Sequence, residues 1–298
     1  MCWLNLRERK VAAVRKLARP AIHSDFESTV TSVRGTVKTA VKANQPLDFP
    51  ADWSRFKIDF TNAQKGKCGF CEGPVLGLQY GDVEHFRPKS EVSELNEDPN
   101  SWGHEEVWKS TVIGRTFKST LTKPGYWWRA YDWHNYLLSC QICNQQWKGS
   151  LFPVVLNQRV LDPESQTEEQ PLLLSPFEDF EPAEHFKYGR LGEISGLSDK
   201  GRATIITCGL DRPSLRLARY RTAKATHEHL DEIAGNITER EMLQLLRYIE
   251  QAGAELQPYC GMVQTIFQSR TGMAWEKLSL LIVTLTGRAS LDRHLCDC

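Results

Sequence analysis

Apolar and polar positions follow a helical spacing along the first part of the chain. The stretch LNLRERKVAAVRKLA sets apolar side chains among Arg and Lys at this spacing, and mixed polarity continues beyond it, so we expect helix within residues 4–43. Pro46 and Pro50 interrupt the pattern, because proline breaks helices. A further helix is expected from about Trp53 to Gln64. Residues 1–66 are therefore predicted to form an N-terminal helical region.

The pattern changes between residues 67 and 153, where short strand-like pieces replace the helical spacing. This part holds four cysteines and six of the nine tryptophans. Residues 91–125 within it are polar with little periodicity, and we predict that they form an inserted loop. Residues 154–208 then carry strand and turn patterns, in the segments PLLLSPFEDF, YGRLGEIS and RATIITCGL.

Helical spacing returns in residues 209–298. Charged helical patterns run through SLRLARYRTAKATHEHLDEI, TEREMLQLLRYIEQAG and GMAWEKLSLLIVTLTG. The longest apolar stretch, Leu278 to Leu285, is far shorter than the roughly 20 residues that cross a bilayer. We expect it to form a buried helix and expect no membrane partner. Together, the four parts predict an α+β fold that is mainly helical.

Composition limits the classes of partner and compartment. The 298 residues include 37 Lys plus Arg and 37 Asp plus Glu, so nucleic-acid binding would have to depend on local basic patches. The first residues, MCWLNLRERK, place charges where the apolar core of a secretory signal would start. We therefore expect a cytoplasmic protein. Thiols stay reduced in that compartment, so the nine cysteines favour metal ligation over disulfides.

Two C-x-x-C pairs, Cys68–Cys71 and Cys140–Cys143, suggest a metal site. Each pair can form a knuckle with two thiolates, and two knuckles complete the tetrahedral four-thiolate site that zinc prefers. Four unrelated buried cysteines and a thioredoxin-like redox motif are the alternatives, and neither pair sits between a clear strand and a long helix. A closed four-cysteine site has no open position for water, so this zinc is predicted to be structural.

The tripeptide Glu-His-Phe occurs twice, and position distinguishes the two copies. Residues 84–86 lie between the two cysteine pairs, and Asn135, Asn144 and Lys148 follow in order. Residues 184–186 lie beyond both pairs without any such frame. We therefore expect the first copy to carry the chemistry and the second to belong to the scaffold.

This ordered set resembles the HNH endonucleases, whose ββα-metal finger is often braced by a four-cysteine zinc. The segments YWWRAYDWHNYLLSCQICNQQWKGSLFPV, PLLLSPFEDFEPAEHFKYGRLGEI and GRATIITCGLDRPSLRLAR narrow the resemblance to the HNH nucleases of bacterial anti-phage systems of the Septu and retron-associated type. The likeness covers roughly residues 60–220. It implies a ββα-metal core within residues 67–153, with flanking helical segments.

The resemblance also implies roles for four residues. His85 matches the general base that takes a proton from water, and Asn135 matches the residue that orients it. Glu84 matches a ligand of a divalent ion, while Asn144 stands where the last histidine usually stands, which makes an HNN variant. Oxygen ligands suit Mg²⁺ or Mn²⁺, and a histidine with an ordinary pKa of about 6.5 can accept a proton at neutral pH. Neighbouring residues point to opposite faces of a strand, so this Glu-His pair is expected to need a bend.

Nucleic acid, DNA or RNA, is the expected substrate. The basic side chains predicted to hold its phosphates are Arg87, Lys89, Lys118, Lys123 and Lys148. Arg87, Lys89 and Lys148 each have a plain alternative as a solvated charge. For Lys118 and Lys123 the alternative is a scaffold or partner-facing role.

The resembled systems pair the nuclease with an ATPase of the ABC/SMC-like type, which implies a hetero-complex. The leading hypothesis is a Mg²⁺-dependent HNH endonuclease with a structural zinc, acting in anti-phage defence. The alternative is a zinc-braced adaptor that binds nucleic acid or protein without catalysis, and the missing last histidine favours it. Against it, Glu84, His85, Asn135 and Asn144 are all present.

Overall fold

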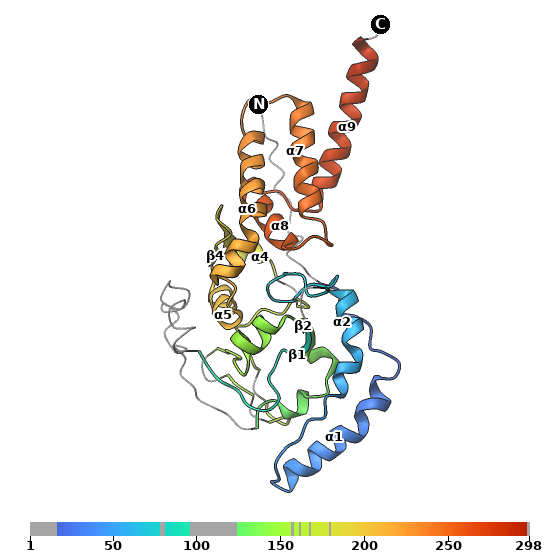
Figure 1. Ribbon diagram of the computed structural model, residues 1–298, viewed down its shortest axis with the longest axis vertical. Coiled ribbons are helices and arrows are strands. Elements are labelled where there is room, and N and C mark those ends of the chain that lie inside the picture. Colours follow the sequence, from blue (N-terminus) through green and yellow to red (C-terminus); the bar gives the residue numbers. More distant parts are fainter. Residues whose placement is uncertain are drawn as a thin grey trace.

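The structure is a computed structural model, and it describes residues 17–77, 81–95, 124–155, 158–160, 162–166, 168–178 and 180–296. Helices dominate this part of the chain, and its strands form two small antiparallel sheets of two strands each. The prediction of a mainly helical α+β fold is confirmed. Figure 1 shows the β1–β2 pair in the lower half of the molecule, with α1 and α2 beside it, and the C-terminal helices at the opposite end.

The N-terminal region is less helical than the sequence suggests. Helix α1 spans Phe26–Lys42, followed by the 3-10 turn η1 (Asp52–Phe56) and α2 (Lys57–Ala63). Residues 17–23 are irregular, so the prediction of helix throughout residues 4–43 is wrong there. Two features explain the difference. Pro20 disfavours a helical residue before it, and the Arg19 guanidinium donates to the carbonyl oxygens of Trp133 and Tyr136 at 3.2 and 3.1 Å.

The central sheet pairs β1 (Asp82–His85) with β2 (Tyr136–Ser139), in the register Asp82↔Ser139 to His85↔Tyr136. The helical segment η5 (Ile142–Lys148), which is of the π type, follows β2 directly. On the other edge of β2, the buried Gln64 side chain acts in place of a third strand. Its amide accepts from Leu138 N at 2.7 Å and donates to Leu138 O at 2.8 Å. The central elements therefore follow one another along the chain as strand β1, strand β2 and helical segment η5. The predicted insertion, residues 91–125, falls largely outside the described residues.

Residues 154–208 contain fewer strands than predicted. The YGRLGEIS segment does form the hairpin β3 (Phe186–Tyr188) and β4 (Ile194–Gly196), whereas PLLLSPFEDF is irregular apart from a bridge between Val154 and Pro171. RATIITCGL is helical, and α5 spans Asp199–Cys208. The expected strand is wrong because α5 is buried over nearly its whole circumference, so its run of apolar residues shows no helical period.

The C-terminal helices build a second core of their own. They are α6 (Pro213–Ile233), α7 (Glu239–Ala252), α8 (Cys260–Thr271) and α9 (Lys277–Cys296), and their buried apolar side chains form one cluster. In α9, Leu278, Ile282 and Leu285 are buried, while Leu280 and Val283 are each 66% exposed. The expected buried helix is thus buried on one face. Among the described helices, none is long and apolar enough to cross a membrane.

The first cysteine knuckle contacts the loop between α7 and α8. Lys67, which is 2% exposed, donates its ammonium protons to the carbonyl oxygens of Glu255 and Gln257. Glu72 O accepts from Tyr259 N at 3.3 Å, and Glu72 Oε2 accepts from Gly261 N at 2.9 Å. These bonds join the knuckle to residues almost two hundred positions further along the chain.

Candidate active site and metal centre

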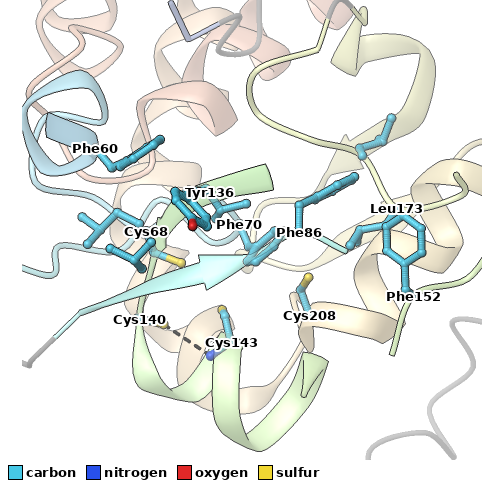
Figure 2. Close-up of a cluster of buried hydrophobic side chains, with 14 of the residues drawn as sticks. Phe60, Cys68, Phe70, Phe86, Tyr136, Cys140, Cys143, Phe152, Leu173 and Cys208 are labelled. Atoms are coloured by element: carbon cyan, nitrogen blue, oxygen red, sulfur yellow. Dashed lines mark hydrogen bonds between the residues drawn. The ribbon is translucent and has the colours of Figure 1, made fainter. Parts of the chain in front are cut away.

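The two cysteine pairs meet, as the sequence predicts. The ligand atoms of Cys68, Cys71, Cys140 and Cys143 all lie within 4.8 Å of one another, and all four residues are buried. Figure 2 shows Cys140 just before η5 and Cys143 in its first turn, with Cys68 near them. Burial opposes ionisation of Cys68, but hydrogen bonds from the other three thiols lower its pKa well below the usual value. Four converging thiols fit a tetrahedral zinc ion, and in the described residues they leave no fifth His, Cys, Asp or Glu within the group.

His85 lies at the end of β1 with its ring enclosed. The ring is in edge contact with Trp53 and Tyr136, at centroid distances of 4.6 and 5.2 Å. Its Nε2 lies 2.8 Å from the carbonyl oxygen of Ala130. A carbonyl oxygen can only accept, so Nε2 carries the proton and Nδ1 keeps the lone pair. Burial, and then the nearby Lys89 charge, lower the pKa of His85 to about 3, so the imidazole is neutral at physiological pH.

Asn135 fixes the backbone that follows His85. Its Oδ1 accepts from Arg87 N at 2.7 Å, and its Nδ2 donates to Arg87 O at 3.0 Å and Arg129 O at 2.9 Å. Its own carbonyl oxygen accepts from Phe86 N at 2.8 Å. Only 3% of Asn135 is exposed, so these bonds form where water does not compete. The amide therefore holds the chain on both sides of the bend after β1.

Glu84 and His85 point away from each other, because β1 is regular through both residues. The chain bends at Phe86 and Arg87, after the pair and not within it, contrary to expectation. Glu84 Oε1 accepts from Lys148 Nζ at 2.6 Å, and Lys148 also donates to His85 O at 3.0 Å. Lys148 is fully buried, so a buried ion pair connects β1 to η5.

Asn144 lies one helical turn before Lys148 on the same face of η5. Its Nδ2 is 3.4 Å from Asp82 Oδ2, and Gln145 Nε2 is 3.1 Å from the same oxygen. Sequence reasoning missed Asp82, although its position two residues before Glu84 on a strand indicates the same face. The carboxylates of Asp82 and Glu84 thus face η5, where Asp82 accepts from the amide nitrogen of Asn144 and Glu84 accepts from Lys148. Such donors suit a hard divalent cation.

The predicted phosphate contacts are placed as follows. Arg87 Nε donates to Glu169 Oε1 at 2.9 Å. The Lys89 ammonium lies 4.6 Å from the centroid of the Trp53 ring and is partly buried. With Lys148 inside the ion pair to Glu84, the three described cations are all engaged within the protein. Lys118 and Lys123 lie outside the described residues.

The second Glu-His-Phe, residues 184–186, lies outside the paired strands β1 and β2, at the end of a short helix. His185 ends the four-residue helix α4 (Pro182–His185), and its Nδ1 lies 2.5 Å from Ser198 Oγ. Ser198 is the N-cap of α5, since its hydroxyl accepts from Gly201 N at 3.0 Å. His185 therefore contacts the start of a scaffold helix.

Comparison with known proteins gives one clear similarity. The chain is 34% identical over 190 residues to the Septu protein PtuB of Bacillus mycoides (strain KBAB4). The aligned part covers 63% of this chain and 56% of that protein, so the chain spans little more than half the length of this relative. No protein-family profile and no solved structure matches the chain. The similarity therefore relates this chain to a Septu protein.

Proposed function

We propose that this protein is a metal-dependent endonuclease of the HNH type that hydrolyses phosphodiester bonds in nucleic acid. The observation that carries the proposal is the tautomer and position of the His85 imidazole. The Ala130 carbonyl holds the tautomer in which Nδ1 keeps the lone pair that a general base needs, and His85 follows the carboxylates of β1 in the chain. The order strand, strand, helix supports the proposal, because it agrees with a ββα arrangement.

Each residue of the candidate site has its own role in the proposed hydrolysis. His85 Nδ1 accepts a proton from the attacking water, and the bond from Nε2 to Ala130 O stabilises the imidazolium that forms. Asn135 keeps the chain after His85 in place. Glu84 and Asn144, with Asp82 on the same face, are the residues that would hold Mg²⁺ or Mn²⁺. When bound, such an ion polarises the phosphate and stabilises the leaving oxygen.

Anti-phage defence is the proposed role. Two observations support it, the similarity to the Septu protein PtuB and the sequence resemblance to defence-associated HNH nucleases. By the same resemblance, we propose an ABC/SMC-like ATPase as the protein partner and the cytoplasm as the compartment. The substrate is nucleic acid, either DNA or RNA.

One observation favours a second function. His85 is only 5% exposed, and Arg87, Lys89 and Lys148 are all engaged within the protein. A zinc-braced adaptor that binds nucleic acid or protein, without cleaving anything, would need no open access to the histidine.

A nuclease assay separates the two functions. The full chain, alone and with its partner ATPase, is incubated with plasmid DNA and with RNA, in Mg²⁺ or Mn²⁺ and with a chelator control. We expect metal-dependent cleavage that His85→Ala reduces by about 10²–10⁴-fold. His185→Ala is the matched control, since it removes the second copy of the same motif, and it is expected to cut like the wild type. Binding without cleavage in every condition would support the adaptor.

A further inference from the structure

Arg212 is a buried arginine whose guanidinium lies against the cysteine cluster. It is 8% exposed, and its Nη1 is 3.5 Å from Cys143 Sγ. The same nitrogen donates to Gly209 O at 2.9 Å and approaches Cys208 O at 3.4 Å. Its Nε is buried without a hydrogen-bond partner. The side chain therefore brings a full positive charge into a nearly dry region.

The turn between α5 and α6 directs this side chain inward. Gly209 ends α5 in the left-handed conformation with φ of 59°, and Pro213 starts α6 at a position where proline is favoured. Arg212 is the N-cap residue between them, with φ of −60° and ψ of 147°. The neighbouring carboxylate, Asp211, forms its ion pair with Arg216. Among the described ion pairs, none gives Arg212 a carboxylate.

A buried charge without an opposite charge is strongly destabilising. The guanidinium of Arg212 lies 3.5 Å from the sulfur of Cys143, and four thiolates outweigh a single Zn²⁺, so a loaded site carries a net negative charge. The inference rests on the metal site proposed above and not on nuclease activity. We propose that Arg212 is the outer-sphere cation of a four-thiolate zinc site, which balances the charge of the site and donates an N–H to the sulfur of Cys143.

Two effects follow from this contact. A hydrogen bond to a thiolate lowers its reactivity toward protons and electrophiles, because it withdraws charge from the sulfur. The guanidinium also compensates the buried negative charge, so the metal-loaded site becomes more stable. Partners of this outer-shell kind typically change metal affinity by roughly 10–100-fold.

The test compares Arg212→Met and Arg212→Lys with Arg216→Met, a control on the same helix whose arginine pairs with Asp211. Purified full-length proteins are loaded with zinc, and transfer of zinc to a chromophoric chelator is followed over time. We expect Arg212→Met to lose zinc about tenfold faster or more, Arg212→Lys to be intermediate, and Arg216→Met to match the wild type. Alkylation of Cys143 by iodoacetamide, located by mass spectrometry, is expected to follow the same order.

Cobalt substitution gives an absorption band that would stay unchanged if Arg212 only supported the fold. In Co²⁺-loaded protein, Arg212→Met is expected to shift the thiolate-to-cobalt charge-transfer band, and Arg212→Lys to shift it less. If Arg212→Met does not fold, the Arg212→Lys band and zinc transfer rate decide the question. Wild-type transfer rates and bands in every soluble Arg212 variant would overturn the proposal. A wild-type chain that binds no zinc would instead remove the metal site itself.

Discussion

The enclosed position of His85 predicts a specific dependence of stability on pH. Burial lowers the pKa of His85 to about 3 in the folded protein, whereas an unfolded chain has a histidine pKa of about 6.5. As the pH falls, the unfolded state binds its proton first. The contribution of His85 to stability is therefore complete above about pH 6.5 and is lost progressively as the pH falls toward 3.

The magnitude at pH 5 depends little on the folded pKa. At that pH the unfolded histidine is almost fully protonated and the folded one remains neutral, which corresponds to about 2 kcal/mol of lost stability relative to pH 8.

The assay is urea denaturation of the wild type and of His85→Gln at pH 8, 7, 6 and 5, with the free energy of unfolding taken at each pH. We expect the wild type to lose about 2 kcal/mol more than His85→Gln across this range. Contributions from other groups are common to both proteins and cancel in the difference. His134→Gln is the control, since its side chain is 65% exposed, and it should follow the wild type. Equal losses in the wild type and His85→Gln would show that His85 is not enclosed as described.

Two further changes test the contacts around the site. Lys148→Met leaves the buried Glu84 carboxylate without its partner and is expected to destabilise the protein by about 3–5 kcal/mol, with much of this recovered in the double variant with Glu84→Gln. Urea denaturation without added Mg²⁺ or Mn²⁺ measures both variants, and a fully stable Lys148→Met would show that the pair does not form. Gln64→Ala removes both bonds to Leu138 and is expected to cost about 2–4 kcal/mol of unfolding free energy. A loss well under 1 kcal/mol would mean that water replaces the amide there.

Local spacing predicted the amphipathic helices and the meeting of the cysteine pairs. Helix α7 starts at the capping box of Thr238 and Glu241, so local hydrogen bonds indicate its first residue. Helix α5 was predicted as a strand, and α8 was not distinguished as a separate helix within the helical region 209–298, because burial on most sides removes the period of 3.6 residues. Both depend on packing against elements distant in sequence, which local spacing does not record.

The residues of the candidate active site show the same limit of prediction from local sequence. The resemblance to HNH endonucleases pointed to Glu84, His85, Asn135 and Asn144, which lie in or beside the paired strands and η5. Lysine is rarely buried fully, so nothing local indicated that Lys148 would face inward toward Glu84. The partner that makes its burial tolerable lies 64 residues earlier in the chain.

The bonds between the first cysteine knuckle and the loop before α8 also set an order of events during synthesis. Lys67 and its acceptor Glu255 are separated by 188 residues. At roughly 5–20 residues per second, the ribosome needs about 10–40 s to deliver the acceptor after the lysine. Until then, the ammonium of Lys67 and the carboxylate of Glu72 lack the contacts that the finished chain provides for them. A nascent chain therefore completes the surroundings of its first knuckle only after the loop before α8 has been synthesised.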